Sequence, residues 1–310
     1  MDPVEWLLAC PEPAVAALTR RDLLDEHKPT PVDGRWVGAL LAGPGAESHP
    51  YRKWTGAHWR LVSLAELGVP AGEPRAEAAA ERVLSWLTGA AHRRAITTVD
   101  GLVRRCASQE GNALAACCRL GLAGDPRVRL LAESLIEWQW PDGGWNCDRR
   151  ATGRRSSFHE SLAPMWGLHE YAAAAASTDP AGAAAAADAA RRVAELLLDH
   201  GVFRSLCTGD VINKGWLVLR YPPYWHYEVL QALLVLSRMG LAGDPHAAEA
   251  VDHIENRRRA DGRWQPGGYW WRAASSSGSG PREIVDWGRS GPNYMITLNA
   301  MRVLRAAGRG

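Results

Sequence analysis

The chain has 310 residues, of which 46% are hydrophobic and 23% are charged. This length allows one large domain or two ordinary ones, and this composition argues against a wholly disordered protein. The formal net charge is only +2, so no broad basic field favours nucleic acid as a partner. Fifteen Trp stand against two Phe, an excess that a hydrophobic core alone does not require.

The start of the chain and its cysteines indicate the compartment. Asp2 and Glu5 stand where a signal peptide needs basic residues, and no apolar run approaches the ~18 residues that cross a bilayer. The six cysteines show no framework typical of secreted proteins. We therefore expect a cytoplasmic protein without a transmembrane segment, whose cysteines are reduced and lie mostly in the core, as for Cys106, Cys117, Cys118 and Cys207.

Glycines and acidic-proline steps divide the chain into regular units. Apolar segments end at Gly68, Gly121, Gly240 and Gly308, which predicts a glycine with positive φ just after a helix. Acidic-proline steps occur at 73–74, 125–126, 179–180 and 244–245, and each predicts the N-cap and first residue of the next helix. Helices are expected, for example, over the apolar residues 229–236 and the amphipathic residues 245–256.

A second repeated element is the tetrapeptide Asp-Gly-x-Trp, found at 33–36, 142–145 and 261–264. The segments 119–126 and 238–245 are also nearly identical. Each polar helix is expected to stop at an Asp-Gly-x-Trp turn, where Trp36, Trp145 and Trp264 would pin the repeat. No strand-like alternation rivals this pattern, so the sequence predicts an all-α protein of five or six helix pairs in a single domain over 1–310.

The turn Gln-Trp-Pro-Asp-Gly-Gly-Trp at 139–145 resembles the repeats of squalene cyclases and protein-prenyltransferase β-subunits. The resemblance covers most of the chain as a period and is strong at 119–171 and 224–267. It implies an α/α toroid (helical barrel), with the active site in a central aromatic-lined cavity that takes an apolar, isoprenoid-like substrate. A prenyltransferase would also need a partner subunit, which the sequence does not identify.

Two histidines occupy matching positions in successive repeats, His159 and His226. With Cys147 and Asp148 they would offer the nitrogen, sulfur and oxygen donors that zinc accepts, so zinc is the expected metal. The resemblance implies a catalytic zinc held by Asp, Cys and His, and His159 matches that His because it follows the Gly-Gly-Trp turn. The family's Asp-x-Cys pair does not appear near Cys106.

Without a metal, His159 or His226 would serve as a general base oriented by Asp148 or Glu160. Further candidate catalytic residues are Tyr224, Tyr227 and Asp286. Aromatic rings suit isoprenoid chains and carbocations, so the substrate-binding candidates are the tryptophans of the same loops: Trp216, Trp225, Trp270, Trp271 and Trp287.

Two other classes of protein compete with this interpretation. Acidic residues near the same loops (Asp148, Glu160, Glu228 and Asp286) also fit a metal-dependent hydrolase or a carbohydrate-active toroid enzyme. A non-catalytic binding or scaffold protein is the third hypothesis. Squalene cyclisation itself is disfavoured, because the Asp-x-Asp-Asp motif that protonates the alkene in those cyclases does not occur here.

Overall fold

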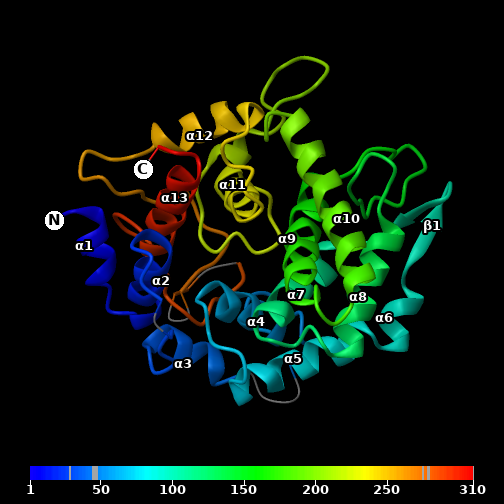
Figure 1. Ribbon diagram of the computed structural model, residues 1–310, viewed down its shortest axis with the longest axis horizontal. Coiled ribbons are helices and arrows are strands. Elements are labelled where there is room, and N and C mark those ends of the chain that lie inside the picture. Colours follow the sequence, from blue (N-terminus) through cyan, green and yellow to red (C-terminus); the bar gives the residue numbers. More distant parts are fainter. Residues whose placement is uncertain (28, 44–47, 274–275, 278–279, 310) are drawn as a thin grey trace. The chain divides into compact units, whose positions relative to one another are not determined.

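The computed structural model describes residues 1–27, 29–43, 48–273, 276–277 and 280–309. Helices dominate them (Figure 1), and the described strands are β1 (Thr97–Val99) and β2 (Leu102–Arg104), paired antiparallel. The prediction of a mainly helical protein is confirmed. The chain divides into two compact units, the first Met1–Ala42, Leu67–Val69 and Leu197–Gly310, the second Gly43–Glu66 and Pro70–Leu196. The single toroidal domain over 1–310 stays a prediction.

The first unit is built around the long helix near the end of the chain. Helix α13 packs against α1, α2, α11 and α12, and Figure 1 shows α2 beside α13. The helical elements of this unit are α1 (Pro3–Leu8), α2 (Pro13–Leu23), α3 (Arg35–Leu41), the 3-10 turn η1 (Lys214–Leu217), α11 (Val229–Arg238), the 3-10 turn η2 (Pro245–Ala247), α12 (Ala248–Glu255) and α13 (Tyr294–Ala306).

The second unit is built around α7, which packs against α4, α5, α8 and α9. The pair α7 and α9 makes the most extensive contact, and the two helices lie side by side in Figure 1. The helices of this unit are α4 (Ala57–Glu66), α5 (Pro74–Leu87), α6 (Ala90–Arg94), α7 (Ser108–Arg119), α8 (Pro126–Trp138), α9 (Phe158–Ala174) and α10 (Pro180–Asp199), whose last residues belong to the first unit.

The predicted helix ends are confirmed. At the end of α7, the Gly121 amide donates to the Cys118 carbonyl at 3.0 Å and the Leu122 amide donates to the Cys117 carbonyl at 2.9 Å. These two hydrogen bonds are those of a Schellman cap. The same arrangement closes α11 and α13. All four expected glycines have positive φ: 73° at Gly68, 82° at Gly121, 75° at Gly240 and 72° at Gly308.

The acidic-proline steps begin helical segments as expected. The Asp125 carboxylate accepts from the Arg127 amide at 2.8 Å, at the start of α8. Asp179 accepts from the Gly182 amide at 3.2 Å, at the start of α10. The last step differs slightly, since Pro245 opens the 3-10 turn η2, which leads into α12.

The Asp-Gly-Gly-Trp turn at 142–145 is held by hydrogen bonds to two helices. The Trp145 indole N–H donates to the Leu135 carbonyl of α8 at 3.0 Å, and the Trp145 amide donates to the Ser161 hydroxyl of α9 at 3.1 Å. In return, the Trp145 carbonyl accepts from the Ser157 amide at 2.8 Å. One buried tryptophan thus joins the end of one helix to the start of the next.

The turn at 261–264 makes the same set of bonds in the first unit. The Trp264 indole donates to the Ile254 carbonyl at 2.7 Å, and the Trp264 amide donates to the Thr297 hydroxyl at 3.1 Å. The Asn293 amide donates to the Trp264 carbonyl at 2.8 Å. The sequence repeat is therefore a structural repeat at these two sites.

The third Asp-Gly-x-Trp copy is different, and the expectation that Trp36 pins a turn is wrong. Gly34 is the N-cap of α3, so Trp36 lies inside that helix. The reason is the buried carboxylate of Glu12, which accepts from the Trp36 amide at 2.6 Å and so satisfies the start of α3.

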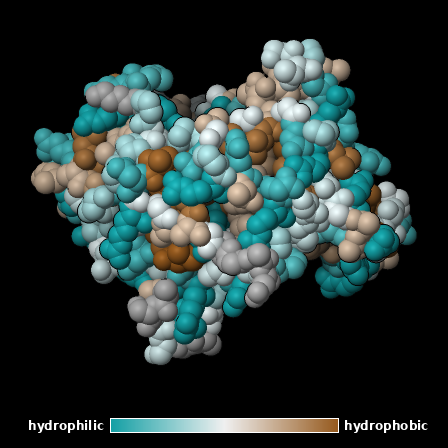
Figure 2. Space-filling model, turned by 90° about the horizontal axis from the view of Figure 1, so that it is seen from below, coloured by the Kyte–Doolittle hydropathy of each residue, from teal (hydrophilic) through white to brown (hydrophobic). Residues whose placement is uncertain are grey.

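No helix in these described ranges is long and apolar enough to cross a membrane. Figure 2 shows one face of the molecule, where hydrophilic and neutral residues predominate and apolar residues form separate small patches.

Candidate functional site

Two cysteine thiols and one glutamate carboxylate meet in the second unit. The thiols of Cys106 and Cys147 and a carboxylate oxygen of Glu160 all lie within 4.8 Å of one another. Cys106 lies just before Ala107, the N-cap residue of α7, Cys147 follows the Asp-Gly-Gly-Trp turn, and Glu160 lies in the first turn of α9. The cluster, named here the Cys–Cys–Glu centre, therefore joins the starts of two neighbouring helices through one loop.

Backbone pairing places the loop that carries Cys147. Asn146 forms a parallel β-bridge with Arg104, and its carbonyl accepts from the Arg105 amide at 3.2 Å. The Asn146 side chain also donates to the Arg155 carbonyl at 2.8 Å, across the loop. Since Trp145 is fixed to α9 and Asn146 to the residues before α7, the chain just before Cys147 is held at the starts of both helices.

Hydrogen bonds link the members of the centre. The Cys147 thiol donates towards Glu160 Oε1 at 3.5 Å, while Glu160 Oε2 accepts from the Ser108 amide at 3.0 Å. Cys147 also hydrogen-bonds the sulfur of Cys106. Because a thiol carries one proton, the single S–H of Cys147 serves two acceptors.

Hydrogen bonding and burial together shift the pKa values of all three groups. The hydrogen bond from Cys147 lowers the pKa of Cys106, and the same bond raises the pKa of Cys147. Burial raises the pKa of Glu160, which is almost fully enclosed. Three groups that are each anionic when deprotonated cannot all ionise this close together unless a cation neutralises them.

A second polar group lies beside the centre. Glu110 of α7 accepts from Arg105 Nη2 at 2.6 Å and lies 3.1 Å from His92 Nε2, and all three side chains are largely buried. Tyr51 hydrogen-bonds Gln109, and burial together with the charge of Glu160 raises the pKa of the Tyr51 hydroxyl. The centre is thus bordered by an aromatic hydroxyl and an Arg–Glu ion pair.

The donor set fits zinc by its chemistry. Two thiolates and one carboxylate are ligands that zinc accepts, and three protein ligands leave a fourth, open position, as in catalytic zinc sites. The lowered pKa of Cys106 also fits a zinc site, because metal binding requires deprotonated ligands. Cys106, Cys147 and Glu160 would hold the ion.

Asp148 and His159 belong to the same unit but are not part of this group of donor atoms. Asp148 forms an ion pair with Arg150 at 2.7 Å, and hydrogen bonds from Arg150 lower its pKa. His159 is half-buried, and burial lowers its pKa by disfavouring the charged imidazolium.

His226 lies in the first unit, between two aromatic rings. Its ring stacks on Trp225 with centroids 4.0 Å apart and on Trp270 at 3.7 Å. Its Nδ1 lies 3.0 Å from the Pro223 carbonyl. Because this nitrogen faces a backbone carbonyl, it carries the proton when the ring is neutral. Cys147, Asp148 and His159 lie in the other unit, so the four-residue zinc set stays a prediction.

The remaining catalytic candidates have structural partners in the first unit. The buried Tyr224 hydroxyl donates to Glu283, and burial raises the pKa of both groups. The Tyr227 hydroxyl donates to the Val202 carbonyl at 2.6 Å. Asp286 is exposed and accepts from the Gly288 amide at 3.0 Å.

The five candidate substrate-binding tryptophans all lie in the first unit. Trp216, Trp271 and Trp287 are buried, whereas Trp225 and Trp270 are partly exposed. The partly exposed pair is the one that encloses His226, and the Arg220 guanidinium also lies over the Trp270 ring, 4.4 Å from its centroid. Among these five tryptophans, Trp225 and Trp270 are the two that leave part of their indole surface exposed to an apolar ligand.

Cys106 is a member of the centre that the sequence did not indicate. Cys106 was expected in the core but lies half-buried beside Cys147, and Cys207 is exposed, so both expectations are wrong. Cys10, Cys117 and Cys118 are buried, and burial raises their pKa values. One signal could have found Cys106: it stands at the start of an apolar helix one repeat before Glu160.

No family model, no curated protein and no solved structure matches this chain.

Proposed function

We propose that the chain is an enzyme whose reactive centre is the Cys–Cys–Glu centre and that zinc is its metal. The supporting observation is the convergence of two thiols and one buried carboxylate within 4.8 Å. A bound zinc ion would supply Lewis-acid chemistry, or would activate a thiolate or water. Around it, Glu160 keeps its orientation through the Ser108 amide, and Arg105 forms an ion pair with Glu110.

The substrate that we propose is apolar and isoprenoid-like, and the architecture that we propose is the α/α toroid. The resemblance of the 139–145 turn supports both, and the matched bonds of Trp145 and Trp264 support the repeat on which the resemblance rests. The accessible indoles of Trp225 and Trp270 suit an isoprenoid chain or a carbocation. A metal-dependent hydrolase is the second candidate, because an open zinc position also binds water.

Zinc binding tests the proposal directly. Reduced, chelator-treated protein is titrated with zinc against a coloured chelator, and we expect one ion per chain with release of protons from the thiols. Zinc should also protect Cys106 and Cys147 from alkylation while exposed Cys207 stays reactive. Cys147→Ser and Glu160→Gln should each weaken binding at least tenfold, and Cys207→Ser should leave it unchanged.

The alternative ligand set is tested in the same titration. Loss of zinc in Asp148→Asn, His159→Ala and His226→Ala, with retention in Cys106→Ser, would replace this centre by the four residues expected from sequence. No binding in any variant or in the parent protein would exclude the zinc enzyme. For the substrate, mass spectrometry should detect a co-purified apolar compound that Trp270→Ala releases, and a co-purified sugar would favour the carbohydrate-active alternative.

A further inference from the structure

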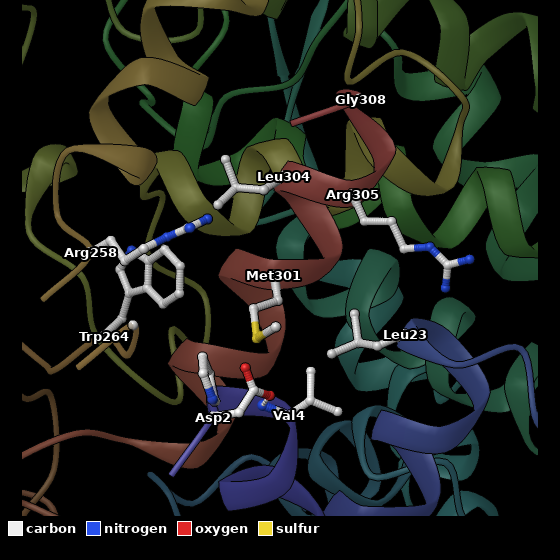
Figure 3. Close-up of a pocket in the computed structure, with 11 residues that line it drawn as sticks. Asp2, Val4, Leu23, Arg258, Trp264, Met301, Leu304, Arg305 and Gly308 are labelled. Carbon is white, nitrogen blue, oxygen red and sulfur yellow. Dashed lines mark hydrogen bonds between the residues drawn. The ribbon is translucent and has the colours of Figure 1, made fainter. Parts of the chain in front are cut away.

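A pocket of about 530 Å³ lies within the first unit, and none of the candidate site residues described above lines it. It is formed by the start of α1, the end of α2, the turn at 258–264 and the last turns of α13 (Figure 3). Its size falls within the range of roughly 300–1,000 Å³ that is typical of small-molecule sites.

Apolar side chains make most of the pocket wall. Met301 and Leu304 of α13 line one side, and Val4 and Leu23 contribute from α1 and α2. Met301, Val4 and Leu23 are only partly buried, so they offer hydrocarbon surface that the protein itself does not cover. Burial of such surface by a ligand would be favourable.

Arg258 is the positively charged side chain of the pocket wall that can contact a ligand. Its guanidinium lies over the Trp264 ring, 5.1 Å from the centroid, and Figure 3 shows it reaching past Trp264 towards Leu304. Among the described residues, no hydrogen bond or ion pair is found for its side chain. The other arginine, Arg305, extends away from Arg258 and Leu304 in Figure 3 and is paired with Asp25 at 2.6 Å.

The one carboxylate in the pocket wall is already engaged. Asp2 is the N-cap of α1 and accepts from the Val4 amide at 2.8 Å, completing a capping box with Glu5. Its charge is therefore partly balanced by the positive end of the short helix. Arg258 is exposed and has no such partner among the described residues, so its guanidinium is open to a ligand anion.

We propose that this pocket binds a small amphipathic anion, with its apolar chain against Met301, Leu304 and Leu23 and its carboxylate or phosphate on Arg258. Guanidinium binds either group through two parallel hydrogen bonds. The fixed indole of Trp264, held by the Ile254 carbonyl, keeps the guanidinium plane oriented. The site is independent of the Cys–Cys–Glu centre, which lies in the other unit.

Four ligands with the same chain and different head groups test the head-group preference. Dodecanoate, dodecyl phosphate, dodecanol and dodecylamine are compared by calorimetry below their micelle concentrations. We expect both anions to bind once per chain and at least tenfold more tightly than the alcohol or the amine, since a charge-assisted hydrogen bond contributes this much. The tighter of the two anions identifies the head group. Equal affinities for all four ligands, or no binding of either anion, would overturn the proposal.

Variants locate the binding. Arg258→Gln should weaken the anions about tenfold and leave dodecanol unchanged, whereas Arg257→Gln, the neighbouring cation outside the pocket, should change neither. Asp2→Asn keeps a good N-cap residue and removes a negative charge, so it should strengthen anion binding. Met301→Trp should fill the pocket and abolish binding. Unchanged anion affinity in Arg258→Gln and Met301→Trp would show that the pocket is not the site.

Discussion

Gly111 of α7 and Gly167 of α9 bring the backbones of their helices into direct contact. A Cβ atom added at Gly167 would lie 2.5 Å from the Gly111 carbonyl oxygen, and one added at Gly111 would lie 2.3 Å from the Pro164 nitrogen. Real Cβ atoms do not come this close to backbone atoms. The crossing exists because glycine has no side chain and because Pro164, inside α9, has no amide hydrogen at the contact.

Gly111→Ala should therefore destabilise the protein by about 3 kcal/mol, the upper end of ordinary overpacking, because backbone rather than a flexible side chain must move. Gly38→Ala is the matched control: Gly38 also lies inside a helix, but an added Cβ there meets nothing within 4 Å. Alanine should stabilise that helix by about 0.5–1 kcal/mol. Urea unfolding followed by tryptophan fluorescence measures both, and equal effects would contradict the close crossing.

His58 should make the protein sensitive to acid. It is fully buried between the rings of Tyr51 and Trp59, its ring nitrogens have no hydrogen-bond partner among the described residues, and burial lowers its pKa to about 3. Below about pH 6.5, His58 binds a proton in the unfolded chain but not in the folded chain. The free energy of unfolding therefore falls as the pH drops.

His58→Phe keeps a ring and removes this titration. Between pH 6 and 4, the free energy of unfolding of the variant should therefore fall less steeply than that of the parent protein, by up to about 1.4 kcal/mol per pH unit. Urea unfolding at several pH values measures the slope. His27→Gln, at an exposed histidine, should leave the slope unchanged, and a slope equally unchanged in His58→Phe would show that His58 does not hold a depressed pKa.

Glu228 should act in the opposite direction. This N-cap residue of α11 is buried, accepts from the amides of Arg220 and Gln231, and burial raises its pKa to about 8. Between about pH 4.5 and 8 the folded chain holds a proton that the unfolded chain has lost. The contribution is therefore fully present below the unfolded pKa and is lost as the pH rises through 8.

Glu228→Gln imitates the protonated acid and should flatten this dependence, so that the variant becomes more stable than the parent protein above pH 8. Thermal unfolding from pH 5 to 9 measures the effect. Glu77→Gln, on the exposed side of α5, serves as the control. The same pH dependence in Glu228→Gln as in the parent protein would contradict the buried, protonated carboxyl.

Local signals in the sequence predicted the helix boundaries, and non-local contacts could not be predicted. Gly121 and Asp125-Pro126 act within a few residues of themselves, so their caps follow from residue type alone. The Gly111–Pro164 crossing joins helices one repeat apart, where no periodic pattern specifies a partner. Trp36 shows the limit of a motif, because the distant carboxylate of Glu12 turned its segment into a helix.

The candidate site divides in the same way. Cys147 and Glu160 were expected near one another because both adjoin the Asp-Gly-Gly-Trp turn. Cys106 was not, because its place beside them depends on the β-bridge between Arg104 and Asn146. His226 was expected as a ligand from its register in the repeat, yet its surroundings, the indoles of Trp225 and Trp270, come from loop contacts that register does not encode.

The equal bonding of Trp145 and Trp264 provides an internal reference for cooperativity. Trp145→Phe and Trp264→Phe each delete one indole hydrogen bond to a carbonyl ten residues earlier, one in each unit. If the chain unfolds in a single transition, both substitutions lower the same midpoint. If the units unfold independently, each substitution lowers only its own transition and leaves the other in place, so this pair of tryptophans can report whether the molecule melts as one body or as two.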